Sequence, residues 1–105
     1  MTESRFFQEN GLIKGFEISG HSTVSANDTE GKIVCSAVSS AAYLTANTLS
    51  EIVKAEISAE VEDGYMKITV KTKISESQVS LKGFYLHASE LANQYRNHVK
   101  VYSEV

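Results

Sequence analysis

The sequence predicts an α+β fold: a mostly antiparallel sheet in β-β-α-β-β-α-β order with two helices packed on it. Two observations carry this prediction. Short stretches in which apolar and polar residues alternate are joined in pairs by tight turns, as in β-hairpins. Two longer stretches repeat apolar residues every three or four positions, as in buried helices. With 105 residues, we expect one domain over residues 1–105 with one modest core.

The first hairpin is expected to join a strand at 4–9 to a strand at 12–19. Asn10 and Gly11 separate them, and both residue types tolerate a positive φ. The second strand should bury its period-two apolar residues, which are Leu12, Phe16 and Ile18.

The second hairpin is the clearest pattern in the sequence. Strands are expected at 57–62 and 65–71, on either side of the turn formed by Asp63 and Gly64. Residues expected to face inward are Ile57, Ala59, Val61, Met66, Ile68 and Val70. A short last strand is expected at 99–102.

Helical spacing predicts helices at about 34–53 and 77–96. The stripe of the first helix is rich in small residues, which would let it lie close to a sheet. Gly83 is expected either to weaken the first turn of the second helix or to delay the start of that helix. The polar segment between the first hairpin and the first helix, residues 20–32, predicts a mobile loop, and loops of this length are often functional.

Composition excludes several classes of protein. A single cysteine forms neither an internal disulfide nor a multi-cysteine zinc site. The net charge of −3 argues against nucleic acid as the main partner. No apolar run reaches membrane-spanning length, and the N-terminal residues contain no apolar signal core, so we expect a soluble, cytoplasmic protein without membrane association.

Cys35 is expected in the first turn of the first helix, where unpaired N–H groups favour an anion. The thiolate is the nucleophilic form of cysteine, so this position suits covalent catalysis. The alternative is a small buried apolar residue, which is the commoner role of a lone cysteine. Backbone N–H groups at the same helix start, including that of Cys35, are candidate oxyanion donors.

His21 is the candidate general base, because the loop from it returns to Cys35. Gly20 would leave room for a substrate beside that histidine. Ser39 lies one helical turn after Cys35 and is a candidate substrate-positioning residue, although such a serine more often fills a close helix contact. His87 and His98 are expected to be ordinary surface or interface residues. No metal or cofactor is expected, because no pair has a zinc-ligand spacing.

From residue 20 to residue 39 the sequence resembles the Prp family of bacterial ribosomal-processing cysteine proteases. It has GHS at 20–22, then a polar loop, then IVCSAVS at 33–39, which matches the family's helix start. The resemblance implies a thiol peptidase with Cys35 as nucleophile and His21 as general base, and it marks Gly20 and Ser39. It also implies a homodimer without a cofactor, and as substrate the precursor of ribosomal protein L twenty-seven, from which a short N-terminal extension is removed.

One position departs from the family pattern. The family usually has an aspartate three residues before the cysteine, where this chain has Lys32. Either Asp28 or Glu30 would then supply the carboxylate, or its role is absent. Two other functions stay open: a non-catalytic dimeric module that binds a ribosomal protein, and a thiol redox protein, although no second cysteine is present to resolve an oxidised Cys35. Tyr95 and Tyr102 are candidates for the dimer interface.

Overall fold

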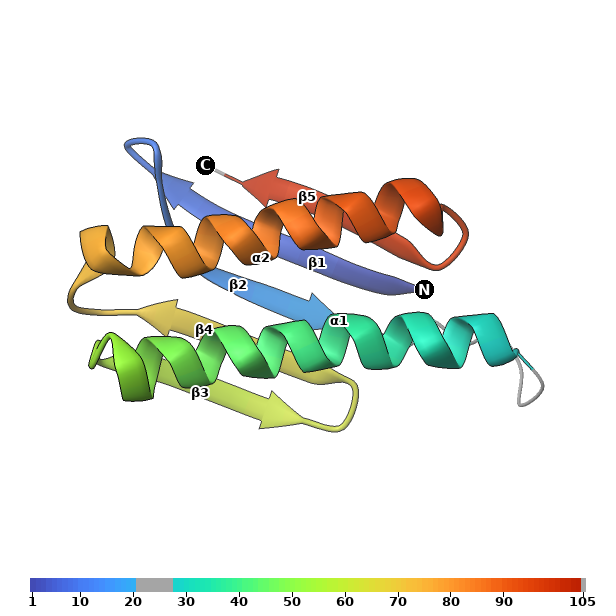
Figure 1. The fold of residues 1–105 in the computed structure, drawn as a ribbon, viewed down its shortest axis with the longest axis horizontal. Coiled ribbons are helices and arrows are strands. Elements are labelled where there is room, and N and C mark those ends of the chain that lie inside the picture. The colour runs from blue at the N-terminus through green and yellow to red at the C-terminus, as the bar shows by residue number, and fades with distance from the viewer. Residues whose placement is uncertain (21–27, 105) are drawn as a thin grey trace.

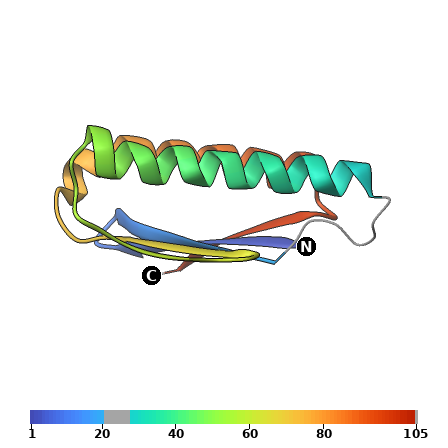
Figure 2. The same cartoon turned by 90° about the horizontal axis from the view of Figure 1, so that it is seen from below.

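The computed structural model describes residues 1–20 and 28–104, and in it two helices lie side by side on one face of a five-stranded sheet (Figure 1). Figure 2 shows that the opposite face of the sheet is not covered by a helix. The elements are β1 (Thr2–Glu9), β2 (Leu12–Ser19), α1 (Thr29–Asn47), the π-helical turn η1 (Thr48–Ile52), β3 (Ile57–Glu62), β4 (Tyr65–Val70), α2 (Ile74–Gln94) and β5 (Val99–Glu104). The predicted α+β class and the order of elements are confirmed.

The strand order across the sheet is β3-β4-β2-β1-β5. All neighbours in this order are antiparallel except β1 and β5, which are parallel. Thr2 pairs with Val99, and Glu3 pairs with Ser19. The start of β1, the end of β2 and the start of β5 therefore meet at one end of the sheet. The chain leaves β2 at this end on its way to α1.

The first hairpin contains an irregularity that changes which residues are buried. The register of β1 against β2 shifts between Phe7 and Gln8, so Ile13 is buried where the alternation predicted Leu12. The Gln78 side chain of α2 supplies hydrogen-bond partners for the strand backbone at this place. Its amide oxygen accepts from the Ile13 N–H and its amide nitrogen donates to the Ile13 carbonyl, both at 2.8 Å. Phe16 and Ile18 are buried as predicted.

α1 begins at Thr29, five residues before the predicted start at 34. The apolar stripe begins only at Val34, but the first turn is stabilised by a cap instead. The carboxylate of Asp28 accepts a hydrogen bond from the Gly31 N–H at 2.9 Å, which satisfies one of the open donors of a helix start. At its other end α1 continues as η1, and Leu49 in this turn is fully buried.

α2 begins at Ile74, three residues before the predicted start. Gly83 therefore lies in the interior of the helix, and the prediction that it weakens the first turn or delays the helix start is wrong. A Cβ built on Gly83 meets no atom within 4 Å. The position is exposed, so this glycine is not required by packing.

The inward face predicted for residues 57–62 is only partly buried: Ile57 packs against the core, whereas Ala59 and Val61 are exposed. β3 is an edge strand of the sheet, and its residues are exposed from Ala59 onward. Val61 is 50% exposed. The alternation correctly predicted a strand but not its place at the edge of the sheet. The neighbouring β4 buries all three predicted residues, Met66, Ile68 and Val70.

The core lies between the sheet and the helices and is centred on aromatic rings. Phe6 of β1 is fully buried and meets Phe84 and Tyr85 of α2 edge-on, at ring-centre distances of 5.3 and 5.0 Å. Phe16 of β2 packs edge-on against Phe84 at 4.9 Å. Within the described ranges, neither α1 nor α2 has the length and apolarity that crossing a membrane requires.

Candidate active site

Cys35 is the seventh residue of α1 and is half-buried. The prediction that it lies in the first helical turn is wrong, because the capped turn at Asp28 moves the helix start toward the N-terminus. The favourable field of a helix N-terminus falls off within the first turn. The thiol therefore lies one turn beyond the strongest part of that field.

This position also overturns the expectation that the Cys35 N–H is an oxyanion donor. In an α-helix each N–H pairs with the carbonyl four residues earlier, which for Cys35 is that of Gly31. Its hydrogen-bonding capacity is used inside the helix. The oxyanion that forms on a substrate carbonyl when the thiolate attacks it therefore needs other hydrogen-bond donors.

Ser39 lies one turn after Cys35, on the same flank of α1, as predicted. It is half-buried and lines a cavity of about 280 Å³ between α1 and the β3–β4 hairpin. Part of the lining is apolar, and the rest comes from two sources: α1 and the β3–β4 hairpin. The lining residues are Ile18, Ser39, Ala42, Tyr43, Glu62, Asp63, Gly64, Tyr65 and Met66. The cavity therefore begins one helical turn from the thiol.

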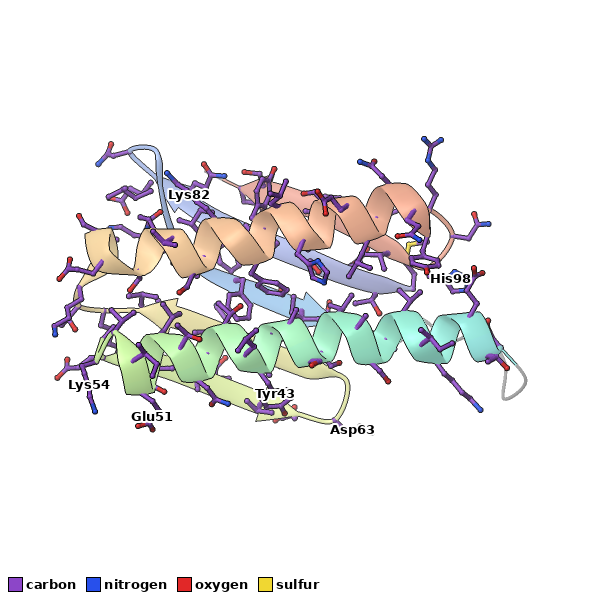
Figure 3. All side chains as sticks on the ribbon, in the orientation of Figure 1. Tyr43, Glu51, Lys54, Asp63, Lys82 and His98 are labelled. Carbon is purple, nitrogen blue, oxygen red and sulfur yellow. The ribbon has the colours of Figure 1, made fainter. Side chains whose placement is uncertain are left out.

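The cavity carries negative charge on its hairpin side. Glu62 and Asp63 line it, and Figure 3 shows Tyr43 and Asp63 on the side of α1 that faces the β3–β4 hairpin. The Tyr65 hydroxyl donates to Glu17 at 2.9 Å. That hydrogen bond, together with partial burial and the charges of Glu17 and its neighbours, raises the pKa of Tyr65. The Tyr65 side chain, like that of Lys67 two residues later, lies on the uncovered face of the sheet, so the negative charge of the cavity itself comes from Glu62 and Asp63.

Gly20 directly follows β2 and holds a conformation that suits glycine. Its φ is +85°, and a Cβ at this position would collide with the Met1 carbonyl oxygen. Its N–H donates to the Gly64 carbonyl at 3.0 Å. The structure thus gives Gly20 a backbone role, and the space beside its α-carbon that was expected to admit substrate is occupied by Met1. His21 lies outside the described residues, so its distance from Cys35 stays a prediction.

The two acidic residues proposed to replace the family aspartate have different surroundings. Asp28 lies mostly buried and contacts His98, with 3.1 Å between Oδ2 and Nε2. Glu30 is largely exposed, with 3.9 Å between its Oε2 and His98 Nδ1. Lys32 is exposed. Asp28 therefore already serves two partners, the helix cap and His98.

Of the two roles expected for His98, an ordinary surface residue or an interface residue, the first is wrong, and the second stays a prediction. Its side chain is 12% exposed, and Figure 3 shows it near the end of the molecule where α1 begins. His87 is exposed on α2 as expected. In the part of the chain that the structure describes, His, Cys, Asp and Glu side chains form no group of three able to hold a metal ion.

Sequence reasoning missed three residues of the candidate site and its surroundings: His98, and the hairpin residues Glu62 and Asp63. The hairpin was correctly predicted, but its position beside α1 depends on the strand order. His98 had no local signal, because its partner Asp28 is 70 positions away. The aspartate itself did carry a signal, since an Asp followed by Thr-Glu is typical of a helix start.

Fold and site together define a small α+β domain with a half-buried thiol on a helix beside a shallow, partly acidic cavity. The sequence matches the family model described as "Cysteine protease Prp" over residues 1–100. The chain therefore belongs to the Prp cysteine protease family, and this membership confirms the resemblance seen in the sequence.

Solved structures share the fold. The crystal structure of SMU.848 from Streptococcus mutans has a TM-score of 0.87 and 24% identity, covering 99% of this chain and 94% of that one. The essential ribosomal processing protease Prp from S. aureus, in complex with a covalently linked product peptide, has a TM-score of 0.88 and 15% identity, covering 99% and 100%. The same protease with a substrate peptide has a TM-score of 0.87 and 14% identity, with the same coverage. No curated protein sequence matches this chain.

Proposed function

We propose that this protein is a cysteine endopeptidase that removes a short N-terminal extension from ribosomal protein L twenty-seven, with Cys35 as nucleophile and His21 as general base. The observation that carries the proposal is membership of the Prp family over residues 1–100, which includes the only cysteine of the chain. The S. aureus relative was solved with a substrate peptide and with a covalently linked product peptide.

The proposed reaction is acyl transfer in two steps. His21 takes the thiol proton, and the Cys35 sulfur bonds to the scissile carbonyl carbon. As the C–N bond breaks, the imidazolium gives that proton to the leaving amine, and a thioester remains on Cys35. Water then attacks the thioester, transferring its proton through His21 to the departing thiolate and releasing the new carboxyl terminus.

The cavity beside α1 supports this function through its shape and charge. Its apolar lining suits the apolar, aromatic stretch that, as the resemblance to the Prp family implies, precedes the cleaved bond of the substrate. Glu62 and Asp63 at the hairpin side would attract the basic residues of a ribosomal protein. In this proposal Ser39 and Gly20 position the substrate and the base: Ser39 lines the cavity, and Gly20 fixes the end of β2 next to His21.

We also propose that the enzyme is a cytoplasmic homodimer. Tyr95 and Tyr102 are poor interface candidates, because both are half-buried: Tyr95 packs on the core, and the Arg5 guanidinium lies 4.6 Å above the Tyr102 ring. Exposed apolar side chains on the helices are better ones, with Leu44 68% and Val79 85% exposed. Light scattering should give a dimer mass for the wild type and a monomer mass for Leu44→Lys.

The peptidase proposal is tested with a peptide that spans the extended N-terminus of the ribosomal protein. Mass spectrometry of the wild-type reaction should show one cut after the aromatic stretch. Cys35→Ala and His21→Ala should each abolish it, because losing either half of such a pair removes about 10⁴-fold or more of the rate. Ser36→Ala, at the exposed neighbouring position, and His87→Ala are the matched controls and should cut normally.

Other outcomes would point elsewhere. A cut that survives Cys35→Ala would exclude the proposed nucleophile. Binding of the peptide by the wild type without any cut would support the second candidate function, a non-catalytic dimeric module for a ribosomal protein.

A further inference from the structure

The side chains of His98 and Asp28 connect the turn before β5 to the start of α1. His98 Nε2 lies 3.1 Å from Asp28 Oδ2, and the two side chains are only 12% and 14% exposed. An ionised carboxylate can only accept hydrogen bonds, so Nε2 carries the proton and donates it. Leaving such a sheltered polar pair unmatched is costly, so this contact holds the two segments together.

Asp28 uses both carboxylate oxygens in this arrangement. Oδ1 accepts from the Gly31 N–H at 2.9 Å, and Oδ2 meets His98. The Asp28 backbone carbonyl accepts from the Lys32 N–H at 3.1 Å. The same carboxylate therefore ends the loop, begins the helix and binds the histidine.

His98 is itself held firmly by the backbone around it. Its carbonyl accepts from the Thr2 N–H at 2.8 Å, and its own N–H donates to the Tyr95 carbonyl at 2.9 Å. These bonds attach it to the start of β1 and to the end of α2. Glu30, 3.9 Å from Nδ1 and 63% exposed, is a second acidic group near the ring. The backbone thus fixes the histidine at this end of the sheet, and through Asp28 the histidine holds the start of α1 there.

We propose that His98 is a positioning residue for catalysis, acting through Asp28 to set where the loop from His21 joins the helix of Cys35. Asp28 lies seven residues after His21 and seven before Cys35. Holding this midpoint limits the relative positions of the proposed base and nucleophile. The role in catalysis rests on the proposed function, whereas the His98–Asp28 contact does not.

Substitutions at His98 separate the hydrogen bond from packing. His98→Gln keeps an N–H donor at about the reach of Nε2, whereas His98→Leu fills similar volume without a donor. His87→Leu and His87→Gln, on the exposed face of α2, are the matched controls. Asp28→Ser keeps a good helix cap but is too short to reach His98 as well.

With the ribosomal-protein peptide as substrate, His98→Leu should lower kcat about tenfold with little change in KM, as expected for displaced reacting groups. Rates are compared per folded enzyme, well below the unfolding temperature of each variant. His98→Gln should restore most of kcat. Asp28→Ser should match His98→Leu, and the double variant should lose no more than either, because both break the same contact. Equal losses in His98→Leu and His98→Gln, or a normal kcat in His98→Leu, would overturn the positioning role.

Hydrogen exchange tests the contact without peptide cleavage. Amide protons of Gly31 and Lys32 should exchange several-fold faster in His98→Leu than in the wild type, and His98→Gln should restore the slow rate. Unchanged exchange in His98→Leu would refute the contact. If no variant cleaves the peptide but exchange behaves as stated, the peptidase proposal fails while the connection from His98 to α1 stands.

Discussion

At Gly20, a single residue controls how the chain leaves the sheet for the segment that contains His21. The positive φ alone favours glycine, and the Met1 carbonyl fills the space that a side chain would need. The sequence made Gly20 a candidate site residue through the neighbouring histidine and the family motif. Its physical reason came from β1, because the start of that strand lies beside the end of β2.

Gly20→Ala should destabilise the protein more than Gly11→Ala does. Both positions have positive φ, but a Cβ on Gly11 meets nothing within 4 Å. Gly11→Ala should therefore lower the free energy of unfolding only by the conformational strain of a positive φ, about 1–2 kcal/mol. Gly20→Ala should lower it by the same strain and, in addition, by the cost of displacing Met1. Urea unfolding gives both free energies. Equal losses would contradict the close contact with Met1.

At the scale of elements, polar side chains rather than apolar stripes decide where helices begin and how they meet the sheet. The apolar stripes predicted both helices, but placed their starts five and three residues late. Asp28 capping sets the true start of α1. Gln78 on α2 holds the irregular part of β2, which no periodic pattern of the sequence revealed.

Gln78→Leu should lower the free energy of unfolding by about 1–3 kcal/mol, because the buried N–H and carbonyl of Ile13 lose their partner. The side chain is buried, so the volume is nearly kept while three hydrogen bonds are removed: the two with Ile13 and the one that Gln78 donates to the Ile74 carbonyl. Gln94→Leu, at the exposed end of α2, is the control and should change stability little. Thermal and urea unfolding measure both. A neutral Gln78→Leu would mean that the irregular strand is satisfied in another way.

At the scale of the whole molecule, one aromatic cluster joins the sheet to α2. Phe6 and Phe16, whose ring centres lie 6.2 Å apart, both pack against Phe84 of α2. Phe7 points to the other face of the sheet, where Lys67 lies 5.6 Å from its ring. Successive strand residues face opposite sides of the sheet, so Phe6 belongs to the core and Phe7 to the uncovered face.

Phe6→Ala should cost about 3–5 kcal/mol, the usual cost for removing a buried aromatic ring. Small domains have about 5–15 kcal/mol in total, so this variant should be close to unfolding at room temperature. Phe7→Ala should cost much less. Circular dichroism during urea unfolding compares them, and similar losses would show that the core does not lie between the sheet and the helices.

The sequence by itself determined the fold class, the order of elements and most strand bounds, and through the family motif it proposed Cys35, His21, Gly20 and Ser39 as site residues. These features depend on local spacing: period two in strands, the helical repeat and turn residues. Only the tertiary structure decided that β3 is an edge strand, that Ile13 replaces Leu12 in the core, and that His98 binds Asp28 at the start of the thiol's helix. Each of these is a contact between segments far apart in the chain, and local spacing carries no information about which distant segments meet.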